Sequence, residues 1–247
     1  MSRTAFHLLR SLNEAPPRAR SYSGKSHVFP GKIVDRHFAS DRLTDRLIRR
    51  LVRDHVIKWK EILESFEFFD QTRKQLRSAT VVDVCCGHGL VGILYALLER
   101  EVERVILADS QIPPNLESTL RVAAELGPWV SDKVEVLEFG ADKLSSRLPV
   151  GSSVLAAHGC GRLTDDALDL AMAVGGAVAV MPCCCHPRSL EAPAVLYGEL
   201  GVKDGVDVHR TYRLHQAGYQ VLWKYIPEAV TPMNRIIVGA PEADARA

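Results

Sequence analysis

Long hydrophobic runs are missing from this sequence of 247 residues, and none approaches the roughly 18 apolar residues that a membrane helix needs. The sequence also has no internal repeat and no low-complexity tract. These absences exclude a membrane protein, a coiled coil, a collagen-like chain and a disordered chain. What remains, with 47% hydrophobic and 25% charged residues, is the ordinary composition of one globular domain with an appendage.

Secretion is not expected, because no apolar core with a small-residue cleavage site occurs near the N-terminus. The six cysteines form a poor disulfide framework, since most are neighbours in sequence and adjacent Cα atoms rarely permit bridging. We therefore expect a reducing compartment, the cytoplasm. The mitochondrial matrix is the alternative, because residues 1–24 combine four arginines with a single acid and resemble a presequence.

The net charge of +1 hides an asymmetry along the chain. Residues 1–60 contain 14 basic and 5 acidic side chains, a balance of +9, whereas the remainder has a balance of −8. A helix is predicted after an N-cap at Ser40 or Asp41, with leucines on one side and arginines on the other. Such an arm binds a polyanion, targets the protein to an organelle, or packs on the acidic body.

Short apolar strands alternate with amphipathic helices from residue 79 onward. Strands are predicted at 80–85, 104–109, 133–139, 153–157, 177–181, 219–226 and 235–238, and helices at 90–100, 116–126 and 165–174. This order predicts an α/β fold, a doubly wound sheet of seven strands whose last two form an antiparallel hairpin. We expect a basic helical extension over 1–75, the sheet domain over 76–240 and a tail over 241–247.

A glycine-rich turn, Asp83-Val84-Cys85-Cys86-Gly87-His88-Gly89, follows the first predicted strand and leads into a helix. Glycines at such a turn let the backbone approach a ligand closely, because they have no Cβ atom. Asp109 ends the next strand, 20 residues beyond Gly89. A carboxylate at that spacing accepts hydrogen bonds from the ribose of an adenosine-containing ligand.

The acid of this turn, followed at two-residue intervals by Cys85, Gly87 and Gly89, resembles motif I of the class I S-adenosylmethionine-dependent methyltransferases. The resemblance covers about residues 75–240 and implies a Rossmann-like fold that binds S-adenosyl-L-methionine. Gly87 and Gly89 would then pass under the amino-acid part of the cofactor, with Asp83 ordering the loop and Asp109 on the ribose. Asp142 would lie beside the adenine or cap a helix. Cys85 departs from the family, which usually has glycine there.

All six cysteines and three histidines follow strands, so we expect them to meet at one edge of the sheet. The segments His158-Gly159-Cys160-Gly161 and Pro182-Cys183-Cys184-Cys185-His186 resemble a narrower group, the tRNA ribose methylases acting near the acceptor end and related domains fused to glutathione-transferase-like modules. The zinc-binding modules of those tRNA enzymes are absent from this sequence.

His158 is predicted as the base that deprotonates the methyl acceptor, and we also place it among the cofactor-binding residues. Asp165 is predicted to orient it, with His186 as the alternative base. Each histidine could instead be a packing residue. A zinc site at Cys160, Cys183, Cys185 and His186 is a weaker reading, because its ligand spacing is too short, and we predict no metal. Covalent attack on a pyrimidine by a cysteine of the fifth strand end is another alternative.

The sequence therefore predicts a methyltransferase that acts on RNA, either tRNA or rRNA, with no membrane association. The RNA prediction depends on the basic arm and on the narrower resemblance. A small-molecule or protein methyltransferase is one alternative. A non-catalytic module that binds the cofactor or RNA is the other.

Overall fold

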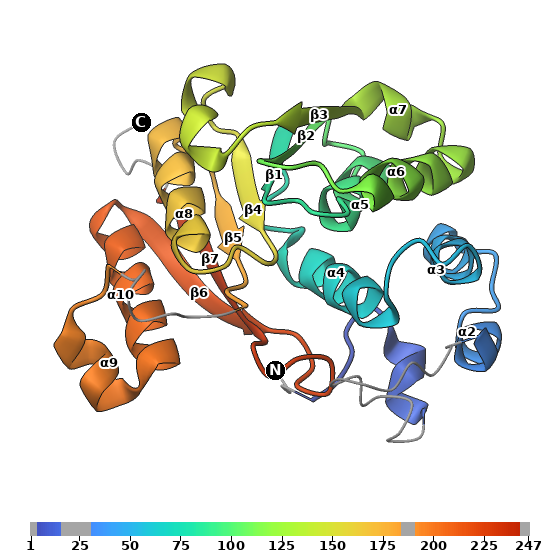
Figure 1. Ribbon diagram of the computed structural model, residues 1–247, viewed down its shortest axis with the longest axis horizontal. Helices are drawn as coiled ribbons and strands as arrows, with labels where there is room; N and C mark the ends of the chain where they lie inside the picture. Colours follow the sequence, from blue (N-terminus) through green and yellow to red (C-terminus); the bar gives the residue numbers. More distant parts are fainter. Residues whose placement is uncertain (1–3, 16–30, 184–190, 243–247) are drawn as a thin grey trace.

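A computed structural model of the chain describes residues 4–15, 31–183 and 191–242. Its centre is a seven-stranded sheet in the order β3-β2-β1-β4-β5-β7-β6 (Figure 1). The strands span Thr80–Val84 (β1), Arg104–Asp109 (β2), Val134–Glu138 (β3), Ser153–Ala156 (β4), Val178–Val180 (β5), Tyr219–Tyr225 (β6) and Arg235–Pro241 (β7). The first five are parallel and β7 runs antiparallel to both of its neighbours, which confirms the predicted α/β fold.

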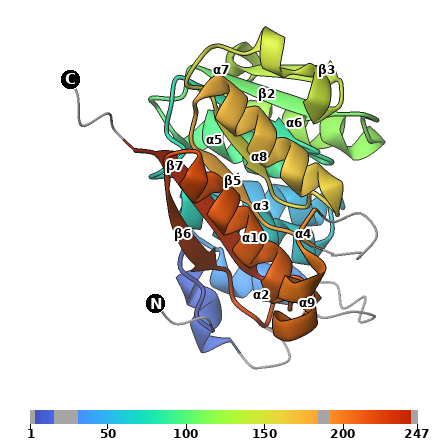
Figure 2. The ribbon, with the colours of Figure 1, turned by 90° about the vertical axis from the view of Figure 1, so that its left-hand side faces the viewer.

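Helices cover both faces of the sheet. One face carries α4 (Trp59–Thr72), α5 (Leu90–Leu98), α6 (Pro114–Leu126) and α7 (Trp129–Lys133). The other carries α8 (Arg162–Val174) and α10 (Val202–Gln216), which run across the front of Figure 2. Two hydrophobic clusters follow from this layering, one on each face. The central strands read as continuous apolar runs because both of their sides are buried.

The extension over residues 1–75 was expected to be helical, and its described part contains α2 (Gly31–His37), α3 (Leu43–Arg53) and α4. His55 has a φ of 52° and breaks the run between α3 and α4. The helix α3 begins at Leu43, two residues after Asp41, the later of the two predicted caps. The hydroxyl of Ser40 does accept a hydrogen bond from the Arg42 N–H at 3.3 Å. Leu47 and Leu51 are buried as expected.

The first described residues are tied to the body of the protein. The short helix η1 (Arg10–Glu14) belongs to the same hydrophobic cluster as α4, α5 and the sheet. The carboxylate of Glu67, buried in α4, accepts backbone N–H hydrogen bonds from His7, Leu8 and Leu9 at 2.8 to 3.1 Å. The extension and the sheet domain therefore share one core.

Among the described residues, three α-helices had no counterpart in the sequence prediction, α7, α9 (Ala194–Leu200) and α10. The inward side of α10 is largely polar, because it buries Asp207 and Arg210 beside Val206 and Leu214. The helical repeat of apolar residues in this segment was therefore too weak to predict α10 from the sequence. In the parts of the chain that the structure describes, no helix is both long and apolar enough to cross a bilayer.

Candidate active site

The glycine-rich turn lies between β1 and α5, where the sequence placed it. Asp83 is buried at the end of β1, and its Oδ2 accepts a hydrogen bond from the Gly92 N–H in α5 at 2.9 Å. Burial, reinforced by the nearby Asp109 carboxylate, raises the pKa of Asp83 to about 7. Gly92 has no room for a Cβ against Leu107 and Asp83, so α5 packs closely on the strands. Asp83 thus fixes the turn to the helix.

Three residues of the turn have positive φ angles: Cys85 (55°), Gly87 (52°) and Gly89 (71°). Cys85 therefore adopts the left-handed conformation that glycine supplies at this position in the resembling family, at a cost of about 1 to 2 kcal/mol for a residue with a Cβ. A Cβ on Gly87 would meet no atom within 4 Å, so open space lies beside its backbone. The turn presents backbone, not side chains, at that point.

Asp109 ends β2 and faces the turn. Its Oδ2 accepts a hydrogen bond from the Gly87 N–H at 3.0 Å, and its Oδ1 accepts one from the Gln111 N–H at 3.3 Å. The carboxylate is half-buried and each oxygen keeps a further lone pair for a ligand hydroxyl. Asp142 is farther along the same edge, exposed in the first turn of the short helix η2 (Ala141–Lys143).

A cavity of about 470 Å³ opens beside the turn. Its lining comes from three places in the sequence: the turn itself, the loops after β4 and β5, and the first turns of α4. Asp83, Cys85 and Gly87 line it at the end of β1 and in the turn that follows, and His158 lines it from the loop after β4. The structure therefore brings together the β1 turn and His158, as the sequence predicted.

An acid from α4 faces the His158 ring. Glu64 Oε2 lies 3.3 Å from His158 Nε2, and Glu64 Oε1 is paired with the ammonium group of Lys60. Glu64 is 1% exposed although it carries a charge. Burial raises the pKa of Glu64, but His158 and Lys60 outweigh it, so the pKa is held below its ordinary value.

Asp165 has a different environment from the one predicted. It is buried at the start of α8, where Arg210 of α10 donates to both of its oxygens at 3.0 and 2.8 Å and Arg213 adds a bond of 3.1 Å. Its carboxylate is therefore engaged by arginines, and Glu64 takes the place beside His158 that we expected Asp165 to fill. Arg210 also donates to the Gly161 carbonyl at 3.0 Å, which supports the loop after β4.

The four cysteines of the described residues meet at this edge, but as a bonded pair, one half-buried thiol and one buried thiol. Cys160 and Cys183 form a disulfide with a Cα–Cα distance of 5.7 Å, against the expectation that the cysteines would not be bridged. The two residues follow the adjacent strands β4 and β5, so they are close in space although they are distant in sequence. Burial raises the pKa of Cys85 to about 12 and that of Cys86 further, which disfavours a thiolate nucleophile at either position.

Three residues of the predicted cluster, Cys184, Cys185 and His186, lie outside the described residues. His186 therefore stays a prediction as the alternative base. Within residues 4–15, 31–183 and 191–242, no group of three His, Cys, Asp or Glu side chains is arranged to hold a metal ion.

Sequence reasoning missed Glu64 and Lys60. The two residues are four apart in α4 and form the kind of pair that usually faces solvent on a helix. The available signal was that Glu64 falls between Ile62, Leu63 and Phe66, on a side of the helix that is otherwise apolar. That pattern indicates a buried acid without indicating its partner.

Residues 57–190 match a family model described as a methyltransferase domain. A Xenopus laevis protein named for a glutathione S-transferase C-terminal domain is 24% identical over 200 residues, which cover 66% of this chain and 31% of that protein. The chain thus spans about a third of its length.

Two solved structures illustrate the fold-level similarity. A methyltransferase from Geobacter sulfurreducens is 10% identical with a TM-score of 0.47, covering 82% of this chain and 90% of that one. A SAM-dependent methyltransferase from Aquifex aeolicus is 19% identical with a TM-score of 0.42, covering 72% and 90%. Similarity at this level says nothing about a substrate.

Proposed function

The chain belongs to the methyltransferase-domain family, and we propose that it is an S-adenosylmethionine-dependent methyltransferase that methylates RNA at the cavity beside the β1 turn. The cofactor supplies an electrophilic methyl group on a sulfonium sulfur. The protein has to bind the cofactor, hold the acceptor in line with the methyl group and take away any proton that the acceptor loses.

The residues around the β1 turn fit the cofactor. Open space beside Gly87 leaves room for the amino-acid part, and the half-buried Asp109 carboxylate keeps acceptor capacity for ribose hydroxyls. Asp83, Cys85 and Gly89 would shape this turn, while the exposed Asp142 would lie on the adenine side. These assignments follow the family resemblance, and the geometry of the turn supports them.

His158 is the base in this proposal. It lines the cavity and its side chain is 38% exposed, so an acceptor in the cavity can reach the ring. His158 would also border the cofactor, because the cavity is continuous with the β1 turn. Asp165 has a supporting role: it holds Arg210, and Arg210 holds the Gly161 carbonyl in the loop that carries His158.

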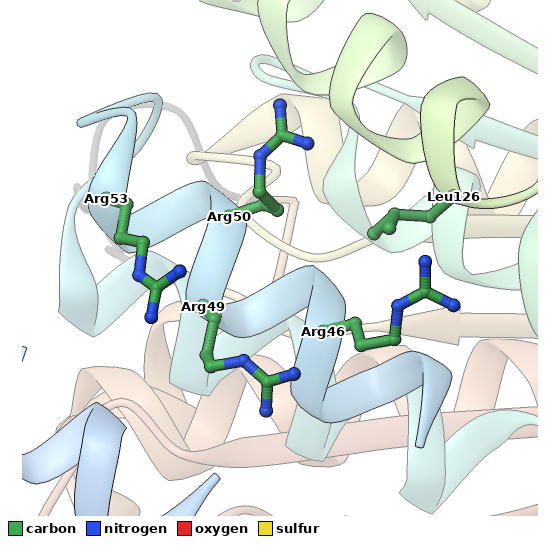
Figure 3. Close-up of a pocket in the computed structure, with 5 residues that line it drawn as sticks. All are labelled: Arg46, Arg49, Arg50, Arg53 and Leu126. Carbon is green, nitrogen blue, oxygen red and sulfur yellow. The ribbon is translucent and has the colours of Figure 1, made fainter. Parts of the chain in front are cut away.

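The observation that favours RNA is the arginine face of α3. Arg46, Arg49, Arg50 and Arg53 project from this helix and, with Leu126 of α6, line a shallow hollow of about 180 Å³ (Figure 3). Arginine side chains clustered on one helix bind phosphate groups through charge and forked hydrogen bonds. Four guanidinium groups border the hollow, and its open shape suits a chain of phosphates that passes over it.

The four arginines do not contribute equally. Arg50 is bound to Asp54 at 3.2 Å and to Glu125 of α6 at 2.7 Å, so it attaches α3 to the body. Arg49 donates to the carbonyls of Phe38 and Ser40. Arg53 makes a long, exposed ion pair of 3.6 Å with Asp35. Arg46 and Arg53 are therefore the arginines best able to bind phosphates.

The arginine face is connected to the cavity by a short piece of chain. Arg53 ends α3, and Lys58, five residues later, lines the cavity. Five residues of extended chain reach at most about 18 Å, the length of a few nucleotides. An RNA bound on α3 can therefore place a neighbouring nucleotide at the cavity.

The experiment is label transfer from S-adenosylmethionine with a radioactive methyl group to unmodified total RNA. We expect label in the RNA fraction that nuclease releases, and we expect Arg46→Glu with Arg53→Glu to weaken RNA binding and flatten its salt dependence. Glu117→Gln, which removes a charge from an exposed position outside the hollow, is the control. If cofactor binds but no RNA is labelled, the RNA assignment is wrong, and label in protein or small molecules would identify the alternative.

A further inference from the structure

A buried acid in the wall of the cavity has no role in the reaction as described so far. Glu64 lies in α4 between apolar residues of the core, where a carboxylate is costly unless its charge is compensated. Lys60 compensates one oxygen, Oε1. The other oxygen, Oε2, is buried and has no hydrogen-bond partner among the described residues, and it faces His158 Nε2 at 3.3 Å.

This contact selects between the two forms of a neutral imidazole. A carboxylate accepts hydrogen bonds and cannot donate them, so it favours a hydrogen atom on the ring nitrogen that it faces. At His158 that nitrogen is Nε2. The lone pair is then on Nδ1, the nitrogen that does not face Glu64.

The second histidine of the cavity is arranged differently. His88 Nδ1 accepts a hydrogen bond from the Leu90 N–H at 3.2 Å, which uses its lone pair. Burial lowers the pKa of His88, so the ring is neutral and carries its hydrogen atom on Nε2. His88 therefore has no nitrogen free to accept a proton, and His158 does.

We propose that Glu64 is the positioning residue for His158: its carboxylate holds the hydrogen atom on Nε2 and leaves Nδ1 to receive the proton of the methyl acceptor. In the reaction the acceptor oxygen or nitrogen forms its bond to the methyl carbon, the electrons of the carbon–sulfur bond stay on sulfur, and the acceptor proton moves to Nδ1. Glu64 then neutralises the imidazolium that results. This inference rests on His158 being the base.

The first test does not depend on the substrate. In protein labelled with ¹⁵N-histidine, long-range ¹H–¹⁵N spectra report which ring nitrogen carries the hydrogen atom, and His158→Ala identifies the His158 signal. We expect the Nε2–H form in the parent protein and a mixture of both forms in Glu64→Gln, because a glutamine side chain can either donate or accept. An Nδ1–H form in the parent, or a spectrum unchanged by Glu64→Gln, would overturn the proposal.

The second test measures methyl transfer to total RNA. Glu64→Gln is expected to lower kcat by about 10- to 10²-fold, the range for groups that orient a histidine, with KM for RNA nearly unchanged. Asp70→Asn, near the end of α4, is the control because it removes a carboxylate from the same helix at a residue that does not line the cavity. The double variant with His158→Ala should be no slower than His158→Ala alone, because the two residues act as a unit.

Thermal unfolding of each variant distinguishes lost chemistry from lost structure. If Glu64→Gln is folded, keeps the parent kcat and shows the parent spectrum, the positioning role is refuted while the RNA proposal stands. If the parent protein labels no RNA, the RNA proposal fails, and the spectra still decide the tautomer of His158.

Discussion

Replacing Asp165 with asparagine should lower stability far more than it alters chemistry, and this contrast distinguishes a supporting acid from a catalytic one. Asp165 is nearly inaccessible, and it receives three hydrogen bonds from Arg210 and Arg213. Arg210 is itself fully buried, so the variant would leave a buried guanidinium with Asp207, at 3.6 Å, as its remaining charged partner. Breaking a buried ion pair in this way costs about 3 to 5 kcal/mol.

A loss of that size is large relative to the about 5 to 15 kcal/mol that stabilises a typical domain. Because Tm changes by about 2 to 4 °C per kcal/mol for a chain of this size, the lower figure corresponds to a decrease of about 6 to 12 °C. Asp169→Asn is the matched control. Asp169 is on the same helix and contacts the same Arg213, but its side chain is 48% exposed, so its loss should cost less than about 1 kcal/mol.

Urea denaturation and calorimetry measure both variants, and methyl transfer is then measured below the lower Tm. Equal unfolding midpoints for Asp165→Asn and Asp169→Asn would refute the argument. So would a stable Asp165→Asn protein that binds cofactor but transfers no methyl group, since that result would return Asp165 to the role predicted from the sequence.

Two further predictions concern the β1 turn. The pKa of Asp83 is raised from 3.8 to about 7 in the folded protein. Its contribution to the free energy of unfolding therefore favours folding below about pH 4 and is lost as the pH rises through about 7. The loss amounts to up to about 4 kcal/mol. Asp83→Asn keeps the acceptor for Gly92 and should flatten the pH dependence of the unfolding free energy; parallel curves for parent and variant would contradict this. Asp109→Ala should weaken S-adenosylhomocysteine binding strongly while the protein stays folded, and titration calorimetry that finds unchanged affinity would remove the ribose assignment.

The sheet could be predicted from the sequence because its signal is local. Val105 to Ala108 is a continuous apolar run and Val81 to Val84 is interrupted only by Asp83, as expected for strands covered on both faces, and the turn after β1 carries its own glycines. The hairpin of β6 and β7 was confirmed because the segment that joins them is too short for a crossover helix.

Side-chain partners could not be predicted in the same way, because they depend on where distant helices pack. Asp165 follows His158 by only seven residues, but its carboxylate pairs with Arg210 of α10. The sequence of α10 has only a weak helical repeat of apolar residues. Glu64 precedes His158 by 94 residues and contacts it because α4 packs on α5 beside the β1 turn. Proximity in sequence therefore did not indicate which acid lies beside His158, and the pattern of α4 indicated a buried acid without indicating its partner.

The strand order has a consequence for how this protein is made. The last strand to be synthesised, β7, fills an interior position between β5 and β6. While residues 235–241 are still inside the ribosome, the adjacent edge of β5 offers unpaired backbone groups to any other strand. Pairing of Ala179 with Val238 must bridge 59 residues, a long-range contact that forms slowly. A nascent chain that stalls before β7 therefore carries an open, apolar sheet edge, and chaperone binding at this stage would protect it from aggregation.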